Sequence, residues 1–178
     1  MENINFNKLL LQTAFSCMAC DGDIDPREVG LIKKLHNDKN LFGNINLVEE
    51  IEVFRVLINE NIALFIRDFF RNLESFELDE EQELKLIEVA IDTIKVDEEI
   101  KYSEIKFFKF IRSKLKISDT KILAIHSDFE EYLAKDIISV TYMLKLQNEF
   151  INTQKLPNFE RIDFGDLNII KEEDGKED

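Results

Sequence analysis

Residues 18–28 read Met-Ala-Cys-Asp-Gly-Asp-Ile-Asp-Pro-Arg-Glu, and they carry the clearest structural signal in the sequence. Gly22 suits the end of a helix, because glycine adopts positive φ without strain. Asp25 can accept hydrogen bonds from the first N–H groups of a following helix, and Pro26 fits its first turn. Glu28 stands three residues after Asp25, which is the spacing of a capping box. The stretch therefore predicts a helix, a tight acidic corner pinned by Ile24, and a second helix.

A second stretch with the same pattern, Lys95–Glu104, lies in the other half of the chain. When the two stretches are aligned, identical residues coincide as Leu10 with Leu86, Ala14 with Ala90, Asp21 with Asp97, Ile24 with Ile100, Glu28 with Glu104 and Lys33 with Lys109. These identities fall at helical spacing on both sides of the corner. They predict an internal duplication of a helix–corner–helix unit.

The composition favours an all-α protein. Only 5 Gly and 2 Pro occur in 178 residues, and no stretch alternates apolar and polar residues as a strand would. Apolar residues at helical spacing predict a single compact bundle of about seven or eight helices. The expected helices cover residues 3–20, 25–38, two within 47–73 that break near 59–61, 79–96, 103–115, a short one at 118–126 and a long one at 128–156.

The predicted domain organisation has three parts. Residues 1–156 form the helical domain, and residues 157–170 form an extended C-terminal segment that packs on the domain or on a partner. Residues 171–178 form a disordered acidic tail, because they are charged and lack apolar residues.

The net charge of −14 argues against direct contact with a nucleic-acid backbone or an anionic membrane surface. It suits a cationic partner or a metal ion, and it also serves solubility. No segment approaches the roughly 20 apolar residues that cross a bilayer, and the first residues lack the basic start of a signal peptide. We therefore expect a cytoplasmic protein with reduced cysteines and no membrane insertion.

The pattern Ala19-x-Asp21-Gly22-x-Ile24-Asp25-x-x-Glu28, set between an apolar and an amphipathic helix, resembles the tellurite-resistance TerB-like family. The resemblance covers roughly residues 6 to 150, with a weaker copy at the second corner. It implies an internally duplicated helical bundle and a role in tellurite or other chemical stress, in phage tolerance, and in complexes near the membrane that include metal-binding partners. The chain departs from the family where Glu98 replaces the glycine and Lys101 replaces the capping acid.

The resemblance also implies a site for a divalent cation, because some members bind one through acidic residues. Carried over to this chain, the candidate ligands are Asp21, Asp23, Asp25 and Glu28 at the first corner and Asp97, Glu98, Glu99 and Glu104 at the second. Carboxylate oxygens suit Ca²⁺ or Mg²⁺, the only cofactors we consider. An EF-hand loop is excluded, since Pro26 stands where its glycine is needed and Ile32 where its last acid is needed. The alternative is that Asp25 and Glu28 are helix caps and that Asp21 and Asp23 are solvated.

The sequence gives weaker support for a redox site or a catalytic site. Cys17 and Cys20 have CxxC spacing, but they lie within or at the end of a predicted helix rather than at the start of one, so we expect them to pack as small apolar residues. His126 is expected near a helix end and His36 on a solvated face. No nucleophile motif and no phosphate-binding glycine loop occur in the sequence, so we expect no enzyme.

Two functional hypotheses follow. The first is a non-enzymatic module that binds other proteins, motivated by the apolar residues of the C-terminal segment, with any membrane association peripheral and through partners. The alternative is a protein that binds Ca²⁺ or Mg²⁺ at its acidic corners.

Overall fold

The computed structural model describes residues 5–22, 24–96, 100–133, 140–153 and 157–165. In these ranges the regular elements are nine α-helices and one 3-10 turn, with no strand. The helices are α1 (Phe6–Ala19), α2 (Pro26–Asn37), α3 (Leu47–Glu60), α4 (Ile62–Ser75), α5 (Glu80–Ile94), α6 (Tyr102–Ser113), α7 (Asp119–Ile125), α8 (Glu130–Leu133) and α9 (Val140–Thr153), and the 3-10 turn is η1 (Ser127–Phe129). The prediction of an all-α bundle is confirmed.

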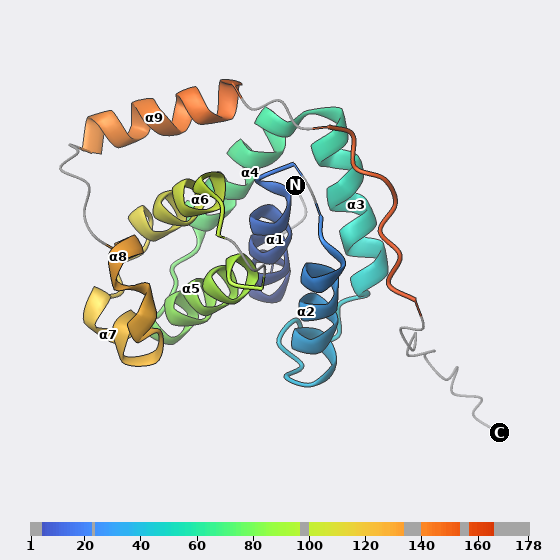
Figure 1. Cartoon of the computed structure of the whole chain (residues 1–178), viewed down its shortest axis with the longest axis horizontal. Helices are drawn as coiled ribbons and strands as arrows, with labels where there is room; N and C mark the ends of the chain where they lie inside the picture. The colour runs from blue at the N-terminus through green and yellow to red at the C-terminus, as the bar shows by residue number, and fades with distance from the viewer. Residues whose placement is uncertain (1–4, 23, 97–99, 134–139, 154–156, 166–178) are drawn as a thin grey trace.

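The end of the bundle was expected to be one long helix over 128–156. The structure describes η1, α8 and α9 there. α8 packs against α6, whereas α9 lies along α4 at the edge of the bundle (Figure 1). Residues 134–139, between α8 and α9, lie outside the described part. The apolar spacing continued through this range, and spacing alone does not reveal which neighbour each piece packs on.

α1 runs through the middle of the bundle (Figure 1). It packs most extensively against α5 and also contacts α3, α4 and α6, and every residue from Leu9 to Ala19 is buried. The polar residues Gln12, Thr13 and Ser16 are also inside the core, where the Thr13 hydroxyl donates to the carbonyl of Leu9 at 2.8 Å. A helix buried on all sides is a central element rather than a surface one.

Asn61 separates α3 from α4, which confirms the predicted break. Its backbone is extended, with φ −159° and ψ 92°. Its N–H still donates to the carbonyl of Leu57 at 3.1 Å, and its side-chain oxygen accepts the N–H of Leu64 at 3.0 Å. One residue therefore ends the first helix and caps the second, so the two helices form a hairpin.

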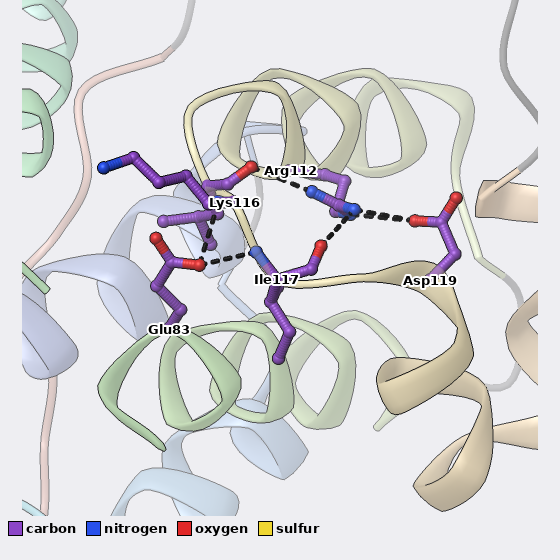
Figure 2. Close-up of polar contacts among 6 residues, drawn as sticks. Glu83, Arg112, Lys116, Ile117 and Asp119 are labelled. Carbon is purple, nitrogen blue, oxygen red and sulfur yellow. Dashed lines mark hydrogen bonds and ion pairs between the residues drawn. The ribbon is translucent and has the colours of Figure 1, made fainter. Parts of the chain in front are cut away.

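The loop that joins α6 to α7 is held from both sides by charged residues (Figure 2). Glu83, a buried residue of α5, accepts the N–H groups of Lys116 and Ile117 at 2.8 and 2.6 Å. From the other side, Arg112 pairs with Asp119 at 2.8 Å and donates to loop carbonyls. These contacts satisfy backbone groups that a buried loop would otherwise leave without partners.

Among the described helices, none combines the length and the apolar character that a bilayer crossing requires.

Candidate functional site

The first corner has the predicted local structure. Gly22 has φ +92°, the left-handed conformation that glycine adopts without strain. The Asp25 side chain accepts the backbone N–H of Arg27 at 2.7 Å, and Glu28 accepts the N–H of Asp25 at 2.9 Å. The Arg27 side chain also donates to Asp25, and these hydrogen bonds lower the pKa of Asp25 to about 2. The capping box read from the sequence is confirmed.

The second corner, of which residues 97–99 lie outside the described part, has the same backbone contact to its capping glutamate. Glu104 accepts the N–H of Lys101 at 2.6 Å, and both capping glutamates are buried, with Glu28 3% and Glu104 2% exposed. Lys101 stands where the first corner has the capping Asp25. Its ammonium forms an ion pair with Asp21, across from one corner to the other. Lys101, one of the two departures from the family pattern, therefore joins the two corners.

The residues that coincide when the corners are aligned also share their degree of burial. Leu10 and Leu86 are both in the core, as are Ala14 and Ala90, and the two capping glutamates are equally buried. Ile24 and Ile100 both pack partly buried against the core. Matched burial is what a duplicated unit predicts, and the duplication itself stays a prediction.

The eight candidate metal ligands fall into two groups. Asp23, Asp97, Glu98 and Glu99 lie outside the described residues. The other four, Asp21, Asp25, Glu28 and Glu104, are occupied by the cap and ion-pair contacts given above. Within the ranges that the structure describes, no group of three or more His, Cys, Asp or Glu residues is arranged to hold a metal ion. The position beside Asp21 where a cation was expected is taken by the ammonium group of Lys101.

Both cysteines are buried in the core next to the corners. The thiol of Cys20 donates to the carbonyl of Cys17 at 3.0 Å, and burial raises the pKa of both thiols well above the usual value. A protonated, inaccessible thiol packs as a small apolar group, as expected from the sequence.

The two histidines were expected at a helix end (His126) and on a solvated face (His36). His126 follows the last residue of α7, at the expected helix end. His36 is only partly exposed, and its ring stacks on Phe42 with the ring centroids 6.3 Å apart. Burial lowers the pKa of His36.

A groove that sequence reasoning missed opens between the α3–α4 hairpin and the start of α1, with a volume of about 780 Å³. We call it the α3–α4 groove. Its aliphatic wall consists of Val53, Leu57 and Leu64, which are 46%, 46% and 52% exposed. It is lined by Asn5, Lys8, Gln12, Glu50, Val53, Phe54, Leu57, Glu60, Asn61, Leu64, Phe65, Asp68, Arg71 and Asn72.

One polar group of the groove lacks a partner. The side-chain oxygen of Gln12 is buried, and no group of the described chain forms a hydrogen bond with it. The charged pairs beside it are complete, since Lys8 binds Glu50 at 2.8 Å and Arg71 binds Asp68 at 2.7 Å. A buried acceptor without a donor is unfavourable, and this oxygen has almost no surface open to the groove.

The C-terminal residues 157–165, which we call the strap, follow an elongated path along α3 (Figure 1). Asn59 binds both backbone groups of Phe159, accepting its N–H and donating to its carbonyl, each at 2.8 Å. Arg55 donates to the same carbonyl at 3.0 Å. Phe159 and Phe164 are both buried. The apolar residues that suggested a partner contact are thus used, in this part of the segment, against the chain's own helices.

Comparison with known proteins identifies no relative, since no family model, no curated protein and no solved structure matches the chain.

Proposed function

We propose that the chain is a non-enzymatic, cytoplasmic protein-binding module of the TerB-like kind, and that its α3–α4 groove receives an amphipathic helix of a partner protein. The observation that carries this proposal is the aliphatic wall of the groove, made of half-exposed Val53, Leu57 and Leu64. Single exposed apolar residues are common, but several gathered in one groove are typical of a binding surface. The resemblance to the TerB-like family directs the search for the partner to the response to tellurite or other chemical stress.

The shape of the groove favours a helix as the occupant. Val53 and Leu57 lie one turn apart on α3, and Leu64 faces the groove from α4. Partner helices bind such grooves with apolar residues three or four positions apart. Each aliphatic side chain is about half exposed already, so completing its burial contributes on the order of 1 kcal/mol.

The polar groups of the groove indicate the chemistry of the helix. Glu60 lines the groove at an exposed position and, among the described residues, forms no ion pair. A basic residue on the partner helix would therefore complement the groove, in agreement with the net charge of −14.

The experiment compares substitutions inside and outside the groove. Leu57→Glu and Leu64→Glu place a charge on the aliphatic wall. Val56→Glu is the matched control, because Val56 is an exposed aliphatic residue of the same helix, 40% exposed, that does not line the groove. Affinity purification of the three variants, with quantitative mass spectrometry, measures the bound partners.

We expect the groove variants to lose the partners at least tenfold and Val56→Glu to retain them, with circular dichroism showing equal helix content. Equal partner profiles for all three variants would refute the groove as the binding site.

A further inference from the structure

We propose a second protein-binding site under the strap, on the surface formed by α2 and α3. Its ligand is an extended segment of a partner protein that carries a phenylalanine. The strap is the intramolecular occupant that this segment displaces.

The first step of the argument is the way in which Phe159 is held. The single amide of Asn59 binds both the N–H and the carbonyl of this residue, and Arg55 binds the same carbonyl. Paired contacts to backbone groups recognise an elongated chain whatever its side chains are. A partner segment in the same conformation can therefore replace the strap without loss of these hydrogen bonds.

Side-chain chemistry then selects the sequence of the segment. The ring of Phe159 is buried beside Asn59, and the ammonium of Lys33 lies 5.9 Å from the centroid of Phe164. Lys33 is the cation of this contact, since Arg55 is already paired with Glu52 of the same helix at 2.7 Å. A phenylalanine ring that a lysine ammonium can face is the complementary chemistry.

The strap does not fill the space available to it. A volume of about 660 Å³ remains between the strap and α2, lined on the helix side by Pro26, Val29, Gly30 and Lys33. Gly30 is an exposed residue inside α2, and a Cβ at this position would meet nothing within 4 Å. Glycine is unfavourable inside a helix, and no contact of the strap requires it. The open helix surface at Gly30 fits a ligand with a larger side chain there than the strap provides.

The test uses a fluorescein-labelled synthetic peptide with the sequence of residues 157–165 and measures its binding by fluorescence anisotropy. In the full chain the tethered strap competes with the peptide at high effective concentration. The double variant Phe159→Ala, Phe164→Ala weakens the strap and leaves the site intact. We expect the peptide to bind this variant at least tenfold more tightly than the unmodified chain.

Two further substitutions in the double variant locate the peptide. Asn59→Ala is expected to lower its affinity at least tenfold, because both backbone contacts are lost. Leu57→Glu is expected to leave it unchanged, so this proposal and the α3–α4 groove can fail separately. A folded double variant that binds no peptide would overturn the inference.

The space over Gly30 is tested with three peptides in which Glu160, Arg161 or Ile162 is replaced by Trp. At least one is expected to bind more tightly than the original peptide, and Gly30→Leu is expected to abolish that gain. If none binds more tightly, the strap is already the best occupant and a larger ligand is excluded.

Light scattering tests a second copy of the chain as the occupant. If the unmodified chain is a dimer that the Phe159→Ala, Phe164→Ala variant cannot form, the occupant is the strap of a second copy and the partner segment is refuted.

Discussion

Replacing Asn59 by alanine tests how the strap is held. The substitution removes the one side chain that binds both backbone groups of Phe159. Arg55 still donates to the carbonyl, so that oxygen keeps a partner, whereas the N–H loses its acceptor. The α3 helix should be unaffected, because alanine is the best helix former.

The expected destabilisation of the strap follows from the two hydrogen bonds that Asn59 forms. Each neutral bond contributes about 1 kcal/mol net, and the remaining Arg55 contact reduces the loss at the carbonyl, so the strap should be destabilised by about 1.5 kcal/mol. That corresponds to a roughly tenfold rise in the fraction of molecules with the strap detached.

Amide hydrogen exchange reports both effects together, because the Phe159 N–H exchanges when the strap opens and also when its acceptor is removed. We expect exchange at Phe159 to accelerate at least tenfold, while amides of the central helix α1 keep their rates. Asn61→Ala is the control. It removes the cap of α4, worth about 1 kcal/mol, without touching the strap. An unchanged Phe159 rate in Asn59→Ala would show that the strap is held by something other than these contacts.

Three further predictions concern the rest of the fold. Glu83→Ala is expected to lower the free energy of unfolding, measured in urea, by about 3 kcal/mol, because two amides of the α6–α7 loop lose their carboxylate partner. Glu81→Ala, at an exposed position of the same helix, should change it by less than about 0.5 kcal/mol. The pKa of Asp25 is lowered from 3.8 to about 2, so its ionised form stabilises the fold above pH 3.8, and this contribution disappears as the pH falls toward 2. Asp25→Asn should therefore flatten that part of the acid-unfolding curve followed by circular dichroism. Because burial raises the pKa of both thiols, Cys17 and Cys20 should resist a thiol reagent in the folded protein and react only on unfolding, and fast labelling in buffer would contradict their burial.

Local signals in the sequence were enough to predict the helices and their ends. Glu28 and Asp25 form the predicted capping box, and Asn61 breaks the α3–α4 pair where polar residues interrupt the apolar spacing. These features depend on residues within a few positions of one another, so the order of residues determines them.

Features that depend on distant neighbours were not predictable in this way. The contact of Lys101 with Asp21 joins residues far apart in the chain, and the sequence alone suggested only the loss of a cap. The burial of Gln12 follows from the four helices around α1, which no periodicity in α1 reveals.

The sequence of α3 contains a signal from which the α3–α4 groove could have been predicted. Val53 and Leu57 lie off the buried stripe of α3 and give the helix a second apolar face. An apolar face with no partner in the chain is the pattern to search for in such helices.

The central position of α1 has a consequence for synthesis of the protein. A ribosome releases α1 first, but α5, its main neighbour, follows only after α2, α3 and α4 have been made. The buried segment from Leu9 to Ala19 therefore stays without its native cover until α5 has emerged. Such a nascent chain is prone to aggregate, so production in cells should depend on chaperones that hold exposed apolar segments.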